Sequence, residues 1–113
     1  MRIRNVTRGT LLGDKIDVAD TSQKRRTGLL RHTGLGEGEG LLIVPCEAVH
    51  TFGMQFPIDV VYVNRKKRVV KTRPNMVRSR ISLCLSAHSV VELPVGVIAS
   101  SRTERGDELA FES

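Results

Sequence analysis

Large aromatic side chains are scarce in this chain, and this scarcity constrains the fold more than any other feature. Of its 113 residues, only Phe52, Phe56, Phe111 and Tyr62 are of this kind. The core therefore has to be built mainly from valine, leucine and isoleucine, and β-branched residues favour strands. A chain of this length is expected to form one domain, over residues 1–113, with a modest core.

Short apolar segments separated by turn signals predict about seven or eight strands. The clearest is Leu41–Val44, a continuous apolar run that stops at Pro45 and is typical of a strand buried on both faces. The polar residues Asn64–Lys67 predict the turn of a hairpin. The other strands are expected at Arg2–Val6, Ile16–Ala19, Ala48–Phe52, Ile58–Val63, Arg68–Thr72, Ser89–Leu93 and Glu108–Phe111.

Two short helices are predicted beside these strands. Capping residues precede Ser22–Arg31, and Pro94 opens the segment Val95–Ser101. The glycine-rich stretch Gly34–Gly40 and the basic stretch Pro74–Cys84 are both expected to be loops. The pattern predicts a mostly β, α+β fold: a compact, largely antiparallel barrel or sandwich with two peripheral helices.

The opening residues and the cysteines indicate the compartment. The first ten residues lack the apolar region of a signal peptide, and no apolar run is long enough to span a bilayer. A cytoplasmic location is therefore expected. Cys46 and Cys84 are too few for a disulfide scaffold, so reduced thiols are expected, with a Cys46–Cys84 bridge as the alternative.

Basic residues are concentrated in one part of the chain, which has a net charge of +6. Between Val60 and Val91 there are basic side chains but no acidic ones. This asymmetry predicts weak polyanion binding through residues 65–80, an acidic protein or small anionic partner, or simply a solvated hairpin. Nucleic acid is disfavoured, because only Tyr62 could stack on a base and no helix-turn-helix pattern is present. The candidate polyanion surface comprises Arg65, Lys66, Lys67, Arg68, Lys71 and Arg73.

Four segments together resemble domain-of-unknown-function family 192, a set of small bacterial and archaeal proteins. The most specific is HTFGMQFPIDVV, starting at His50, and the resemblance covers nearly the whole chain. It implies a single β-rich domain with short helices and no established reaction. Many members carry a leader, and none is expected here from the first residues. Gly53 stands where many members have a bulky residue, which is expected to leave a gap beside Met54. The four segments are Val18–Arg31, Gly38–Val63, which contains this motif, Val90–Gly96 and Arg105–Leu109.

Two Cys-x₃-His pairs suggest a metal site at low probability. Cys46 precedes His50 and Cys84 precedes His88 by the same spacing, so the four could form a Cys₂His₂ site. The usual spacing of structural zinc ligands is absent, however. The alternative is that the cysteines pack in the core and each histidine bonds a backbone carbonyl.

Two carboxylates stand among apolar residues, where burial without a partner is costly. Asp59 is interpreted as accepting backbone N–H bonds, pairing with Arg31 or Arg26, or lining a pocket with a raised pKa. Glu92 is interpreted as an outward-facing residue of an edge strand. A second hypothesis for Glu92 pairs it with Asp59 as an acid/base site.

These observations favour a binding module over an enzyme, and they predict no cofactor. We expect a small-ligand or protein-interaction module with a pocket near His50, Met54 and Asp59, which Glu92 and Arg31 also line. The enzymatic alternative is a small hydrolase that uses Asp59 with Glu92, or Cys46 with His50. It is weaker because neither cysteine precedes a helix start that would lower its pKa.

Overall fold

Ten strands form three sheets in the computed structural model, which describes residues 1–113. The largest sheet has five strands, and β9 is its middle strand. All neighbours in this sheet are antiparallel except β3 and β4. In spatial order the strands are β3 (Lys15–Ala19), β4 (Glu39–Ile43), β9 (Ser89–Leu93), β6 (Ile58–Val63) and β7 (Val69–Met76).

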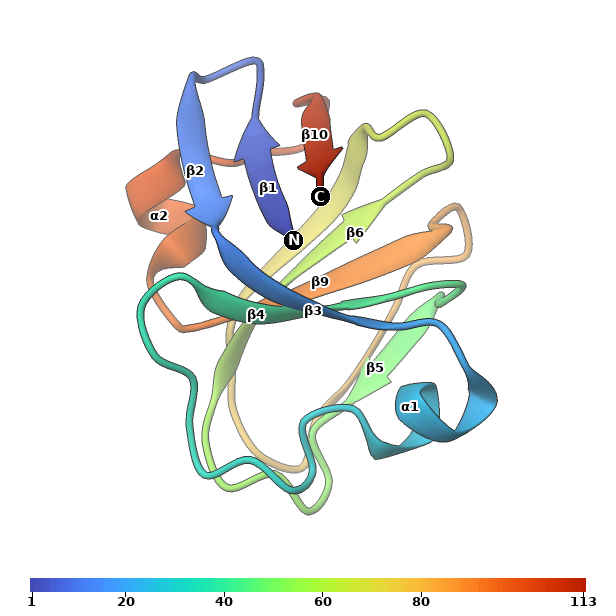
Figure 1. The fold of residues 1–113 in the computed structure, drawn as a ribbon. Coiled ribbons are helices and arrows are strands. Elements are labelled where there is room, and N and C mark those ends of the chain that lie inside the picture. Colours follow the sequence, from blue (N-terminus) through green and yellow to red (C-terminus); the bar gives the residue numbers. More distant parts are fainter.

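The five-stranded sheet is covered on both faces (Figure 1). One face is covered by the three-stranded sheet of β10 (Leu109–Glu112), β1 (Arg2–Asn5) and β2 (Thr10–Gly13), together with α2 (Val97–Ser101). The other is covered by α1 (Ser22–Thr27) and the two-stranded sheet of β5 (Ala48–His50) and β8 (Ile81–Leu83). The sheets form a compact, sandwich-like fold and do not close into a barrel.

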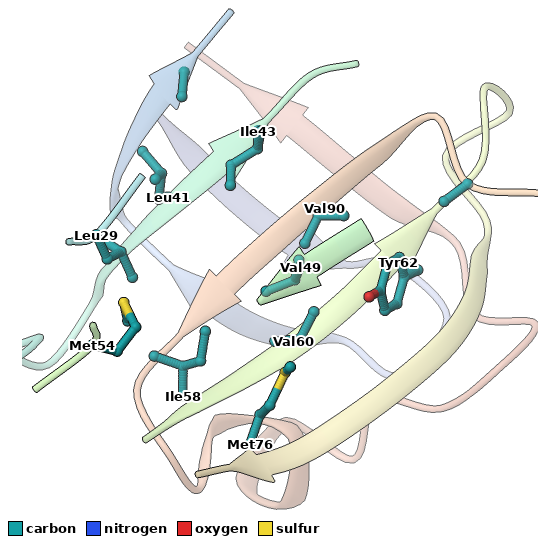
Figure 2. Close-up of a cluster of buried hydrophobic side chains, with 12 residues drawn as sticks. Leu29, Leu41, Ile43, Val49, Met54, Ile58, Val60, Tyr62, Met76 and Val90 are labelled. Atoms are coloured by element: carbon teal, nitrogen blue, oxygen red, sulfur yellow. The ribbon is translucent and has the colours of Figure 1, made fainter. Parts of the chain in front are cut away.

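Side-chain alternation along the central strands creates two separate cores. Within β9, Val90 packs toward α1, whereas Val91 and Leu93 pack toward α2. Every residue of β6 and β9 is buried, as is typical of strands covered on both faces. Figure 2 shows the core on the α1 side, here called the α1-side core. Its members are Ala19, Leu29, Leu41, Ile43, Val49, Met54, Ile58, Val60, Tyr62, Met76, Ala87 and Val90.

The α2-side core lies between the five-stranded sheet and the three-stranded sheet. Its members are Ile3, Leu12, Ile16, Leu42, Val61, Val63, Val69, Val91, Leu93, Ile98 and Leu109. Both cores consist largely of valine, leucine and isoleucine, as the scarcity of large aromatics predicted. The largely antiparallel, mostly β fold with two short helices is confirmed.

The expected loop at Pro74–Cys84 is wrong. The strand count is higher than predicted because neither β2 nor β8 was expected. β7 continues through Pro74 to Met76, and β8 lies within the supposed loop. Proline is tolerated here because β7 is an edge strand, so its missing N–H breaks no ladder. β8 has only three residues, too few to show an alternating pattern.

The first helix is also shorter than the predicted segment Ser22–Arg31. Thr21 caps its start by accepting a hydrogen bond from the Lys24 N–H. It ends at Thr27 because Gly28 takes a positive φ of 48°, a conformation that an L side chain rarely adopts. Leu29 therefore lies beyond the helix, where it enters the α1-side core.

Gly40 brings β4 close to β9, and we expect Gly40→Ala to destabilise the protein. A Cβ at this position would lie 2.7 Å from the backbone oxygen of Glu92 and 2.8 Å from Ile16 Cδ1. Since the backbone cannot move without separating the strands, the free energy of unfolding, measured in urea, should fall by about 1 to 3 kcal/mol. Gly34→Ala is the matched control, because nothing lies within 4 Å of its Cβ. A Gly40→Ala variant as stable as this control would contradict the close approach.

Candidate functional site

Glu92 is the most unusual polar residue in the structure. It lies on the middle strand, and its register partners are Leu41 on β4 and Val60 on β6, both in the α1-side core. It is only 4% exposed, and no protein group stabilises its charge. Burial raises the pKa of this carboxyl from its ordinary 4.5 to about 7. The predicted outward-facing Glu92 on an edge strand is therefore wrong, because β9 is central and this side chain points into the core.

Glu92 lines a small cavity of about 80 Å³ beneath α1. The cavity lies between the α1 segment, the end of β4 and β5, so that elements far apart in the sequence form its walls. Met54 and Leu29, which also line it, are labelled next to each other in Figure 2. Titratable side chains in the lining are Arg25, Arg26, Cys46, His50 and Glu92.

Arg25 supplies an opposite charge to the same cavity. Its Nε is buried and has no hydrogen-bond partner. Its terminal nitrogens donate only long hydrogen bonds of 3.4 Å, to the Pro45 carbonyl and to Ser22 Oγ. Arg25 and Glu92 both act electrostatically on Cys46, with opposite effects on its pKa. A buried carboxyl and a guanidinium, both with unused hydrogen-bonding capacity, thus line one cavity.

Cys46 and His50 are not arranged as a nucleophile and its base. Cys46 Sγ donates a hydrogen bond of 3.1 Å to the Ala48 carbonyl. Burial raises the pKa of this thiol above its ordinary value, so the reactive thiolate is disfavoured. His50 is exposed, because Val49 takes the inward position on β5, and the His50 ring lies 5.8 Å from the Phe52 ring.

A larger outer cleft, of about 970 Å³, shares a wall with the inner cavity. The two have Arg25, Ile43, Cys46 and Ala48 in common. The outer cleft lies between the segment after β4, the β6–β7 turn and the loop before β9. Its charged lining is mostly basic: Arg25, Arg65 and Lys66 face a single acid, Glu47. His88 also contributes to this wall.

Asp59 has a structural role away from this cavity. Its register partner is Leu93, so it lies on the α2 side of the sheet, opposite Glu92. Its Oδ1 accepts a hydrogen bond of 2.8 Å from the Asn75 N–H. Its Oδ2 accepts bonds of 3.1 and 2.9 Å from the N–H groups of Gly96 and Ile98. Asp59 therefore holds β7 and the start of α2 against β6.

This placement corrects the candidate pocket predicted around Asp59. Asp59 accepts backbone N–H bonds, one of its three proposed roles, but the donors come from distant segments rather than from a local turn. None of the ion pairs includes Asp59, and Arg31 is exposed. The proposed Asp59–Glu92 acid/base pair is not formed, because the sheet separates the two carboxylates. His50, Met54 and Glu92 do share one cavity.

The two Cys-x₃-His pairs do not form a metal site in the structure. No group of three or more His, Cys, Asp or Glu side chains is arranged to hold a metal ion. Cys46 and Cys84 are free thiols, so the alternative of a bridge between them is not formed. Cys84 Sγ lies 3.4 Å from Ser86 Oγ, and both cysteines pack at the margin of the α1-side core.

The basic residues of the predicted polyanion surface are dispersed. Arg68 forms an ion pair of 3.3 Å with Glu108, and the Lys67 ammonium lies 5.0 Å from the centre of the Phe111 ring. Lys71 lies over the Tyr62 ring and donates to the Leu83 carbonyl at 2.8 Å. Only Arg65 and Lys66 line the outer cleft. Arg73, half-buried on β7, has no acidic partner.

The expected gap beside Met54 corresponds to a surface hollow of about 580 Å³. Gly53, Met54 and Arg78 are among its lining residues. Gly53 adopts a φ of 79°, which explains why a glycine suits this position. Arg25 is the site residue that sequence reasoning missed. Nothing in the sequence distinguishes it from its basic neighbours Lys24 and Arg26. In the fold Arg26 also lines the cavity, but Arg25 alone has a buried Nε and lines the outer cleft as well.

Comparison with known proteins identifies the family. The family model named DUF192, described as an uncharacterized ACR, matches residues 3–111. This chain belongs to the DUF192 family. A UPF0127 protein of Thermococcus kodakarensis is 28% identical over 114 residues, which cover 96% of this chain and 72% of the relative. The DUF192 resemblance inferred from the motifs is therefore confirmed.

Two solved structures share the fold of this DUF192 chain. A protein of unknown function from Novosphingobium aromaticivorans has a TM-score of 0.82 at 20% identity, covering 97% of this chain and 82% of its own. A protein from Sinorhizobium meliloti has a TM-score of 0.83 at 19% identity, covering 96% and 89%. At this identity the likeness shows the fold alone. A bilayer-crossing helix would need far more apolar length than α1 or α2 provides.

The raised pKa of Glu92 should make stability fall as pH rises. The folded protein retains the proton up to about pH 7, whereas the unfolded chain releases it near 4.5. The stabilisation is therefore present below pH 4.5 and lost as pH passes through 7, by about 2 to 3 kcal/mol between about pH 5 and pH 8. Urea unfolding across this range checks it. Glu92→Gln should be more nearly pH-independent, and an unchanged slope would refute the raised pKa.

Asp59→Asn should destabilise the protein because an amide has only one oxygen and cannot accept the three N–H bonds that the two carboxylate oxygens accept. Its NH₂ group would face a backbone donor, at a position only 1% exposed. We expect a loss of about 2 to 4 kcal/mol in the free energy of unfolding, measured in urea. The control is Asp17→Asn, an exposed residue on β3, with a change within about 0.5 kcal/mol. Equal stability of the two variants would argue against the role given to Asp59.

Proposed function

We propose that this protein is a non-enzymatic binding module for a small organic anion that also carries an amine or hydroxyl group. α-Amino acids and α-hydroxy acids are the simplest members of this class. The anionic end would contact Arg25 at the basic wall between the cavity and the cleft. The amine or hydroxyl would reach Glu92 inside the cavity.

The observation that carries this proposal is the unpartnered carboxyl of Glu92. A buried polar group without a hydrogen bond costs about 1 to 3 kcal/mol, so a purely structural role is poorly explained. An apolar residue would pack better between Leu41 and Val60. A ligand that donates to Glu92 would recover the missing interaction, and perturbed titratable groups in cavities are common at functional sites.

The electrostatics of the outer cleft support the anionic half of the ligand. Arg25, Arg65 and Lys66 outnumber Glu47 there, which favours a negative group at the entrance. The buried Arg25 Nε is a hydrogen-bond donor without an acceptor, and a carboxylate provides one. The size of the cavity, about 80 Å³, limits the inserted group to a few atoms.

The catalytic alternatives lack the geometry they need. The carboxylates of Asp59 and Glu92 lie on opposite faces of the sheet. The Cys46 thiol is held in its protonated form by burial. A binding role requires neither a carboxylate pair nor an activated thiol, and it uses the residues that the fold brings together.

Thermal-shift measurements with glycine and glycolate test the proposal. A ligand at about ten times its Kd should raise the Tm by about 5 °C for a domain of this size. Acetate and methylammonium, which each lack one of the two groups, should have little effect. For glycine, the affinity should increase as pH rises through 7, because the ammonium group binds the ionised form of Glu92.

Variants locate the binding in the cavity. Glu92→Gln and Arg25→Ala should each weaken the shift at least about tenfold in ligand concentration, the loss expected for one charged hydrogen bond. Lys24→Ala is the matched control, since Lys24 is exposed on the same helix and does not line the cavity. Equal shifts with acetate, or shifts that survive in Glu92→Gln, would refute the role of Glu92.

A further inference from the structure

An apolar surface covers the outer side of the two-stranded sheet. Ile81 is 67% exposed, Leu83 51% and Leu85 74%. The register pairs Ile81 with His50 and Leu83 with Ala48, so these side chains share one face, while Val49 and Ser82 point inward. Phe52, 49% exposed, contacts the His50 ring. We call this surface, formed by His50, Phe52, Ile81, Leu83 and Leu85, the β5–β8 face.

The β5–β8 face differs from the other exposed apolar side chains of the molecule. Val6, Leu11 and Val95 come from three separate segments, after β1, on β2 and before α2, and scattered exposed apolar side chains are ordinary. The β5–β8 face instead gathers Ile81 and Leu83 on one face of β8, with Phe52 two residues after β5 and Leu85 two residues after β8. Contiguous apolar patches of this kind mark protein interaction sites.

Basic side chains surround the β5–β8 face. Arg78 and Arg80 precede Ile81, and the Arg80 carbonyl accepts a hydrogen bond of 2.9 Å from the Thr51 N–H, beside Phe52. At the opposite end, Leu85 lines the outer cleft together with Arg65 and Lys66.

Other charges near the face are few. The Lys71 ammonium bonds the Leu83 carbonyl at 2.8 Å, along the edge of the sheet. Glu47 directly precedes Ala48 in the sequence, and no acidic residue occurs between Val60 and Val91, the stretch that contains β8. His50 lies on the face itself. The net surrounding charge is therefore positive.

This charge distribution selects the kind of partner. A second copy of the chain would bring one basic rim against another, and like charges facing each other disfavour association. An acidic segment would gain electrostatic attraction at the rim and apolar burial at the centre. We propose that the β5–β8 face docks an acidic, apolar-rich segment of another protein. This inference rests on other observations than the ligand proposed for the Glu92 cavity, although His50 belongs to both surfaces.

A peptide array tests the inference with defined probes. One set contains ten-residue peptides composed of Glu, Asp, Val, Leu and Phe, and the second set has Lys and Arg in place of the acids. The labelled full-length protein should bind acidic members at least about tenfold more tightly than their basic counterparts, and the difference should shrink in high salt.

Substitutions on the face provide the decisive comparison. Threonine is β-branched and suits a strand, so Ile81→Thr and Leu83→Thr should not lower the Tm. Each variant removes apolar surface from the face and should weaken peptide binding at least about fivefold. Leu11→Thr, on an exposed site of β2, is the matched control and should bind normally. Equal binding of both peptide sets, or none, would overturn the proposal. So would a dimer in light scattering that Ile81→Thr dissociates, because the occupant would then be a second copy.

Discussion

The coverage of the central sheet on both faces is the constraint on which the rest of this structure depends. β9 has strands on either side and a packed layer above and below, so all of its side chains lose contact with water. Two cores built largely from valine, leucine and isoleucine fill the space on both faces of the sheet, although large aromatics are few. The same coverage leaves Glu92 without solvent, and this is why its carboxyl holds a proton up to about pH 7.

Two carboxylates that look alike in the sequence have opposite roles in the fold. Asp59 and Glu92 both interrupt apolar strands, and both are almost fully buried. Asp59 receives three backbone N–H groups, so its charge is compensated and it ties β7 and α2 to the sheet. Glu92 receives none and borders a cavity with Arg25. The difference arises because the two side chains point to opposite faces of the sheet and meet different neighbours there.

Charge is distributed in the fold differently from its distribution along the chain. The basic stretch after β6 is divided among ion pairs, cation–π contacts and the outer cleft. Arg25, from a different part of the chain, joins Arg65 and Lys66 there. Together these residues make a basic entrance beside the cavity that Glu92 lines, and Arg65 and Lys66 also border one end of the apolar β5–β8 face.

Local patterns in the sequence were sufficient for most strands, for both helices and for the DUF192 family. β6 and β9 were predicted with their observed boundaries, because valine and other strand-favouring apolar residues dominate both segments. Pairing explains the errors: Pro74 fits within β7 only because that strand is an edge, and three-residue β8 exists only because β5 pairs with it. Such information is not local, so no short window of sequence contains it.

The candidate site was likewise predictable from the sequence only in part. The sequence by itself determined that Asp59 and Glu92 needed partners or a function, since an unpaired carboxyl among apolar residues is costly. Only the tertiary structure decided which carboxyl found donors, because strand register and parity assign each to one side of the sheet. It also brought Arg25 and Glu92 to one cavity, which lies between the α1 segment, β5 and the end of β4. Composition determines what must be buried, but long-range packing determines what each buried group meets.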